Sequence, residues 1–164
     1  MSEHLEKADV AMRNLRRRLR GKINLLIVDD NPTALTLFEA AFDSPSFAVT
    51  VADTLDQART AVVAKRRPWH CWLMDMHLDG DKTVEEFYPA NSGFPFLVLV
   101  SGVSSRTETT EALRQGAQYV FDKGEEQIRA LITMACKVCA LGLVMKGQHT
   151  NHDHLFSSLL HNDH

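Results

Sequence analysis

The chain has 164 residues, of which 45% are apolar and 24% are charged, so it is long enough to bury the core of one globular domain. Its 18 Lys and Arg residues against 21 Asp and Glu residues give a formal net charge of -3 at pH 7. This balance argues against a protein that binds nucleic acid through a strongly basic surface.

The cysteine count and the hydropathy pattern indicate the compartment. The three cysteines, Cys71, Cys136 and Cys139, are an odd number in a chain with a large core, which favours free thiols over a disulfide framework. The amino terminus lacks an apolar signal core. The most apolar stretch, 131–145, is interrupted by Lys137 and is shorter than the roughly 20 residues of a membrane span. We therefore expect a cytoplasmic protein without a membrane span.

Short apolar runs alternate with amphipathic segments along the chain. The first run, Ile23 to Val28, is apolar and partly β-branched, which is typical of a strand buried on both faces. A helix is predicted from Pro32 to Phe42, because Pro fits the first turn of a helix. The other predicted strands are 47–51, 70–74, 96–100 and 119–121, and the other predicted helices are 54–66, 83–90, 106–115 and 125–145. Gly116 is expected to end the helix that precedes it.

Five strands that alternate with helices predict an α/β fold with a doubly wound, five-stranded parallel sheet covered on both faces. The connections between such strands are right-handed. We expect this domain to span residues 23–140, with an amphipathic helix over 1–22 before it and a helical extension with a His-rich tail over 141–164.

Polar and charged residues follow four of the five predicted strands. Asp29 and Asp30 follow the first strand, Asp75 the third and Ser101 the fourth, and Lys123 comes after the fifth. Because the carboxyl ends of parallel strands meet at one edge of a sheet, these groups are expected to converge. Three carboxylates in one place repel one another, and a hard divalent cation such as Mg²⁺ relieves the conflict. A carboxylate can also act as a nucleophile that forms an acyl phosphate, with Lys and Ser side chains beside the phosphate oxygens.

These residues, together with Gly102 and the pair Gly116-Ala117, resemble the signature of the two-component response-regulator receiver family over about residues 22–140. The likeness is to a stand-alone receiver of the chemotaxis type. It implies a flavodoxin-like fold with the strand order 2-1-3-4-5.

The resemblance also implies a role for each polar residue. Asp75 accepts the phosphoryl group, Ser101 turns toward it, and Lys123 pairs with it. The implied ligands of Mg²⁺ are the carboxylates of Asp29, Asp30 and Asp75 and the backbone carbonyl of His77.

The implied phosphoryl donor is a phosphohistidine on a sensor histidine kinase or a histidine phosphotransfer protein, and the implied output is contact with a downstream protein target. Only about 40 residues follow the fifth strand, and one helix of the receiver uses half of them, so we expect no DNA-binding output module. The domain is not expected to be an enzyme toward other substrates, although the resemblance implies catalysis of its own phosphorylation and dephosphorylation.

Three departures from the family pattern bear on the output. Val120, between Tyr119 and Phe121, stands where the family usually has an aromatic residue, so either a neighbour replaces that residue or the output surface is read differently. Gly124 replaces a frequent Pro and accepts many backbone angles. The loop over 76–81 lacks the familiar Pro and carries two additional acids.

Two other function classes stay open on the sequence. One is a receiver-like interaction module that keeps the acidic pocket and does not switch on phosphorylation. The other is a phosphatase with an aspartyl intermediate. Such enzymes carry a second acidic residue two positions after the nucleophile, but that position is occupied by His77 in this chain.

The leading segment, residues 1–22, predicts an amphipathic helix. Its apolar residues recur in steps of three and four, the spacing of a coiled-coil seam. They are Leu5, Ala8, Met12, Leu15 and Leu19. This helix packs on the same chain, docks on a partner, or forms a homodimer together with the carboxyl-terminal helix.

Cys136 and Cys139 form a C-x-x-C pair inside the last predicted helix. Because a redox-active pair belongs at the start of a helix, we interpret both as small buried residues. The alternative is a zinc site shared with tail histidines such as His149 and His152.

Overall fold

The computed structural model describes residues 23–43, 47–64, 69–78, 82–88, 96–102, 105–117 and 119–122. Within these residues, five parallel strands form one sheet in the order β2-β1-β3-β6-β7. The strands are β1 (Ile23–Val28), β2 (Phe47–Ala52), β3 (Cys71–Asp75), β6 (Phe96–Ser101) and β7 (Tyr119–Asp122). The predicted α/β fold with a parallel sheet is confirmed.

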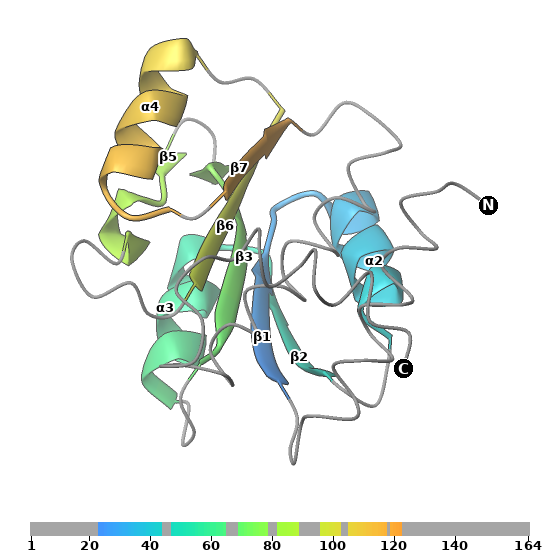
Figure 1. Ribbon diagram of the computed structural model, residues 1–164. Coiled ribbons are helices and arrows are strands. Elements are labelled where there is room, and N and C mark those ends of the chain that lie inside the picture. The colour runs from blue at the N-terminus through green and yellow to red at the C-terminus, as the bar shows by residue number, and fades with distance from the viewer. Residues whose placement is uncertain are drawn as a thin grey trace, which may run out of the picture.

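Helices cover both faces of this sheet. Figure 1 shows α2 on one face and α3 and α4 on the other. Their bounds are α2 (Pro32–Ala41), α3 (Leu55–Ala64) and α4 (Arg106–Arg114). Each begins within one residue of its predicted start, because a polar side chain accepts hydrogen bonds from the first turn. The capping residues are Asn31 for α2, Thr54 for α3 and Ser105 for α4.

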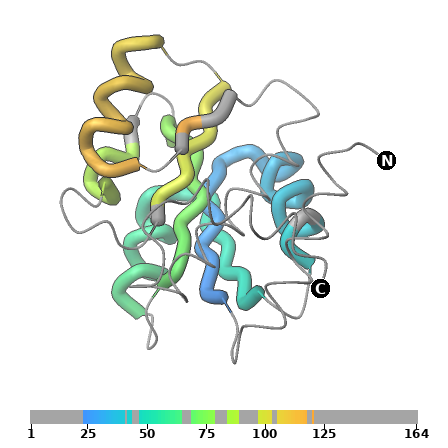
Figure 2. The backbone as a smooth tube through the Cα atoms, in the orientation of Figure 1, coloured from blue at the N-terminus to red at the C-terminus, as the bar shows by residue number. Residues whose placement is uncertain are grey.

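The core lies on both faces of the central strand β1, which is buried along its whole length. Leu26 and Val28 belong to an apolar cluster that includes Leu55 of α3. Leu25 and Ile27, which point to the opposite face because side chains alternate along a strand, are also 0% exposed. The carboxyl ends of β1, β3 and β6 lie at the same edge of this sheet, as the backbone tube in Figure 2 shows.

The prediction of a helix over residues 83–90 is wrong. The structure has instead a pair of short antiparallel strands, followed by a single turn of 3-10 helix at Glu85–Phe87. The two strands are β4 (His77–Leu78) and β5 (Lys82–Thr83). A small antiparallel pair therefore follows β3, immediately after the predicted phosphoacceptor.

Packing and a proline explain this difference. Val84 is 0% exposed, and Phe87 packs edge-on against Trp72 with ring centroids 5.8 Å apart. Tyr88 has the extended angles φ -66° and ψ 127°, which a residue before a proline prefers. The extended backbone of Tyr88, which directly precedes Pro89 in the sequence, thus ends the helical turn as soon as Phe87 has reached the core.

An ion pair joins this 3-10 helix to α3. Arg59 donates two hydrogen bonds to the carboxylate of Glu86, at 2.6 and 2.9 Å. The guanidinium holds the pKa of Glu86 below its usual range. Both side chains are about half exposed, so this pair contributes little to the stability of the fold.

The predicted helix over 1–22, the last helix over 125–145 and the His-rich tail within 141–164 lie outside the described residues. None of the helices in the part of the chain that the structure describes combines the length and the apolarity needed to cross a bilayer.

A matched pair of substitutions tests the assignment of the core. Val98 is 0% exposed in β6, whereas Val63 in α3 is 86% exposed. We expect Val98→Ala to lower the free energy of unfolding by about 2 kcal/mol, because two buried methyl groups are lost. Val63→Ala should change it by less than about 0.5 kcal/mol. Urea denaturation of both variants measures the difference, and equal destabilisation would contradict this core.

Candidate functional site

Three carboxylates gather where β1 and β3 end. Asp29 and Asp30 follow β1, Asp75 is the last residue of β3, and the two strands are hydrogen-bonded neighbours. One carboxylate oxygen from each residue lies within 4.8 Å of the other two. Asp29 is 0% exposed and Asp75 is 8% exposed, whereas Asp30 is open to solvent. The structure thus brings these three predicted site residues together.

Backbone contacts fix Asp29 in this cluster. Its amide donates to the carbonyl of Ala52 at 3.1 Å, which extends the pairing of β1 with β2 by one residue. Its Oδ1 accepts a hydrogen bond from the amide of Asn31 at 2.8 Å. Asn31, in turn, caps α2 with its own side chain. Capping of the first helix is therefore the task of Asn31, and it does not account for the two aspartates.

Asp75 and Ser101 end neighbouring strands. Asp75 is the register partner of Val100, and Ser101 is the next residue of β6. The Asp75 Oδ1 accepts a hydrogen bond from the amide of His77 at 3.2 Å. Ser101 is 1% exposed, and its Oγ has no hydrogen-bond partner among the described residues. Because buried hydroxyls are nearly always hydrogen-bonded, this Oγ is suited to form a hydrogen bond with a polar ligand.

The loop after Asp75 is tied to α4 by a contact that sequence analysis did not predict. The Nε2 of His77 lies 2.7 Å from the Oε2 of Glu108. Glu108 also closes a capping box with Ser105 at the start of α4. The hydrogen bond to His77, followed by the one from the Ser105 backbone, holds the pKa of Glu108 below its usual value. The pattern Ser105-x-x-Glu108 signals the helix start in the sequence, but nothing local in it indicates His77.

The residues of this cluster fit a hard divalent cation. All three donors are carboxylates, the ligand type that Mg²⁺ and Ca²⁺ prefer, and one of them is fully buried. Burying one carboxylate beside two others is unfavourable unless a positive charge is close. These three carboxylates could therefore hold a hard divalent cation.

The match to a protein family agrees with this geometry. The response regulator receiver domain family matches the chain over residues 25–135. The chain belongs to this family. The matched range contains each of the polar residues on which the resemblance was based, from Asp29 to Lys123.

This receiver is similar to several known proteins. It is 31% identical over 103 residues to the transcriptional regulatory protein ZraR of Salmonella typhimurium. The aligned residues cover 60% of this chain and 22% of ZraR. The chain therefore spans about a fifth of the length of that relative.

Solved structures show the same fold. The signal receiver domain of the response regulator NarL from Mycobacterium tuberculosis has a TM-score of 0.61 and 24% identity, over 74% of this chain and 98% of that one. A response regulator of Burkholderia pseudomallei with a phosphorylated aspartic acid, a calcium ion and citrate has a TM-score of 0.55 and 16% identity, over 84% of this chain and 72% of that one.

Several predicted features of the receiver lie outside the described residues. Lys123 and Gly124 are among them, as are the side chains of Tyr119 and Phe121. Val120 is described, and it is partly buried against the apolar cluster under α3 and α4. The family's usual aromatic position is thus occupied by an aliphatic residue that packs on the core.

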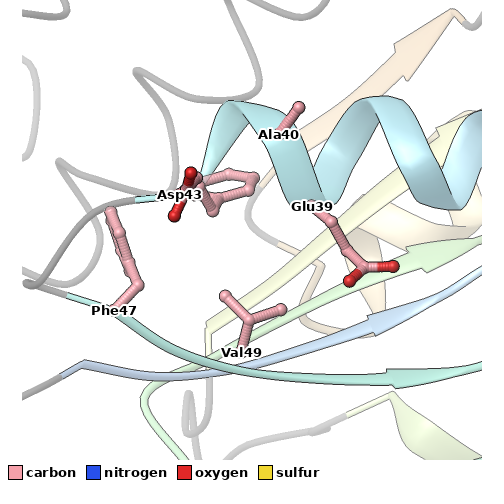
Figure 3. Close-up of a pocket in the computed structure, with 6 residues that line it drawn as sticks. Glu39, Ala40, Asp43, Phe47 and Val49 are labelled. Carbon is pink, nitrogen blue, oxygen red and sulfur yellow. The ribbon is translucent and has the colours of Figure 1, made fainter.

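A separate hollow of about 390 Å³ lies away from the carboxylates. Figure 3 shows it between the end of α2 and the start of β2. These elements meet at the opposite edge of the sheet from Asp75. The lining residues are Glu39, Ala40, Phe42, Asp43, Phe47 and Val49. This hollow shares no residue with the carboxylate cluster.

Removing one carboxylate tests the metal centre. We expect Asp30→Asn to weaken Mg²⁺ binding by more than about tenfold, since even the loss of an outer-shell partner of a metal ligand costs that much. Without metal, the same variant should be more stable than the parent by about 1 kcal/mol, because one repulsive charge is gone. Isothermal titration and urea denaturation measure the two effects. Asp43→Asn, the same change at an exposed position away from the cluster, should alter neither, and equal Mg²⁺ affinity in all three proteins would contradict the site.

Proposed function

We propose that this receiver domain takes a phosphoryl group onto Asp75 and signals through contacts with other proteins. The observation that carries the proposal is the cluster of three carboxylates within 4.8 Å, in which Asp75 is the last residue of a central strand. A slightly exposed carboxylate at such a strand end is held in place and can still be reached by a donor.

The proposed reaction is a phosphoryl transfer from histidine to aspartate. A carboxylate oxygen of Asp75 attacks phosphorus while the bond from phosphorus to the donor's imidazole nitrogen breaks. The leaving nitrogen keeps the electron pair and takes up a proton, and Asp75 becomes an acyl phosphate. The donor is a sensor histidine kinase or a histidine phosphotransfer protein.

The other site residues have supporting roles in this proposal. Asp29 and Asp30, with Asp75 and the backbone carbonyl of His77, would hold Mg²⁺, which neutralises charge on the transferring phosphoryl oxygens. The Oγ of Ser101 has no hydrogen-bond partner among the described residues, which supports a hydrogen bond from it to the phosphoryl group. On the basis of the family pattern, the ammonium group of Lys123 is proposed to pair with the phosphoryl group.

A solved relative supports this chemistry. The Burkholderia pseudomallei response regulator is described with a phosphorylated aspartic acid and a calcium ion. An acyl phosphate and a divalent cation thus occur together on this fold, and the all-oxygen donor set of the present chain suits the same pair.

The output of the domain is proposed to be a change of protein contacts. Phosphorylation replaces the single negative charge of the Asp75 carboxylate with a group of about 1.5 to 2 negative charges at the strand ends, beside the loops that lead to α4. We propose a cytoplasmic switch with a receiver over 23–140, flanked by helices over 1–22 and 141–164 that serve homodimerisation or docking of a downstream protein. Nucleic-acid binding is not part of this proposal.

A second candidate is an interaction module that does not switch. Val120 favours it, because a partly buried aliphatic side chain cannot replace the aromatic residue whose rotation, in the family, accompanies the movement of the hydroxyl at the position of Ser101 in β6. The two candidates differ in whether the occupied site alters the surface of the protein.

Replacing the acceptor tests the phosphorylation site. Acetyl phosphate with Mg²⁺ is expected to label the parent protein and to leave Asp75→Asn unlabelled, because an amide cannot form the acyl phosphate. Phosphate-affinity electrophoresis measures the label, and circular dichroism verifies that the variant is folded. Asp43→Asn serves as the control and should be labelled like the parent. Label on Asp75→Asn would mean that another residue is the acceptor.

Light scattering separates the switch from the passive module. With Mg²⁺ and beryllofluoride, the scattering mass should rise from the 18.4 kDa of one chain toward that of two chains if the output is a homodimer. The ¹⁹F spectrum reports in the same sample whether beryllofluoride is bound. Bound beryllofluoride with unchanged mass and unchanged chemical shifts outside the site would favour the module.

A further inference from the structure

The carboxylate of Glu108 serves two parts of the receiver at once. Its Oε2 lies 2.7 Å from the Nε2 of His77, on the loop that follows the acceptor. Its Oε1 accepts a hydrogen bond from the amide of Ser105 at 3.4 Å, and the amide of Glu108 donates to the Ser105 Oγ at 3.1 Å. One side chain thus joins the acceptor loop to the first turn of α4.

The contact continues to the reacting carboxylate. The amide of His77 donates to the Oδ1 of Asp75 at 3.2 Å. The Asp75 carboxylate, the His77 backbone, the His77 ring and the Glu108 carboxylate therefore form a continuous line of polar contacts to the cap of α4. His77 keeps a quarter of its side-chain surface exposed, so much of the ring is enclosed.

The next acid of the same helix makes no such connection. Glu111 lies one turn further along α4 and, among the residues that the structure describes, accepts hydrogen bonds from Arg114 and Gln115, in and just after the same helix. The two glutamates differ in what they join, although they share a helix, a charge and similar exposure. Glu111 is therefore a matched control for Glu108.

We propose that Glu108 is a positioning residue that transmits the state of Asp75 to the start of α4. The inference rests on the proposed function, because its input is the phosphoryl group on Asp75. When the Asp75 oxygen becomes part of an acyl phosphate, it loses charge and accepts the His77 amide less well. The contact between the His77 ring and the Glu108 carboxylate then changes, and so does the hydrogen bond between Glu108 and Ser105 at the cap of α4.

This route is suited to a chain with Val at position 120. The polar line of contacts needs neither a rotating aromatic nor the Ser101 hydroxyl. Its end point is the first turn of α4, where the side chains of Ser105 and Arg106 are exposed and open to a partner.

Amide hydrogen exchange of the full chain, with and without Mg²⁺ and beryllofluoride, tests the route. The reporters are the amides of Glu108 and Thr109, which are bonded to the Ser105 side chain and backbone. In the parent, beryllofluoride should change their exchange rates. In Glu108→Ala and Glu108→Asp that change should shrink by about two- to fivefold, the size of effect expected from a single polar contact between partly exposed side chains. Glu111→Ala should respond like the parent.

Two further features keep the test decisive. Glu108→Asp retains an acid at the third position of the helix, so its cap persists while the carboxylate is withdrawn from His77. In the metal-free protein, the His77 amide should exchange about two- to fivefold faster in both Glu108 variants and not in Glu111→Ala. This second readout does not require a loaded site.

The possible failures are distinguishable. Parent-like responses in both Glu108 variants, with the ¹⁹F signal of bound beryllofluoride present, would overturn the role of Glu108 and leave the phosphoacceptor intact. Absence of that ¹⁹F signal in the parent would overturn the proposed function, and the role of Glu108 would fall with it.

Discussion

The register between β1 and β3 is the constraint on which the functional site depends. Val28 is paired with Met74, so the next residues of the two strands, Asp29 and Asp75, end side by side. Asp30 adds a third carboxylate within the same 4.8 Å. The strands cannot separate without breaking the centre of the sheet, so the carboxylates stay close despite their repulsion. The apolar packing of the central strands holds an arrangement that the site alone would not favour.

The amino and carboxyl edges of the sheet therefore differ in the side chains that they bring together. At the amino edge of β2, Phe47 packs edge-on against Phe42 with centroids 5.1 Å apart, next to a hollow that Glu39 and Asp43 also line. At the carboxyl edge lie a buried carboxylate and the hydroxyl of Ser101, which has no hydrogen-bond partner in the described part of the chain, and both are unfavourable in isolation. Local features that oppose stability gather at one edge, as expected where a fold carries a ligand site.

The short antiparallel pair after β3 connects this edge to the helical layer. It directs His77 toward α4, and the buried Phe87 anchors the following turn beneath α3 and α4 through Trp72. The segment after the acceptor is thus a packed element between site and surface. The movements of this segment are limited by its contacts, and packed segments of this kind shift between discrete arrangements rather than gradually.

Much of the architecture was predictable because its signals are local. The apolar run of β1 indicated a strand buried on both faces, Asn31 and Ser105 marked the starts of helices, and Gly116 adopts the positive φ of 110° expected at a helix end. The three aspartates were predictable for a related reason. Once the strands are parallel, the residues that follow them must lie at one edge.

The rest required the tertiary structure. The local sequence over 83–90 predicts a helix. The structure has a single turn there, because Phe87 is buried against Trp72. The contact between His77 and Glu108 joins residues 31 positions apart. Local sequence determines which conformation a segment prefers and where its polar residues stand. Which distant side chains meet depends on how the strand pair and α4 pack over the sheet, and that packing is decided by the whole core at once.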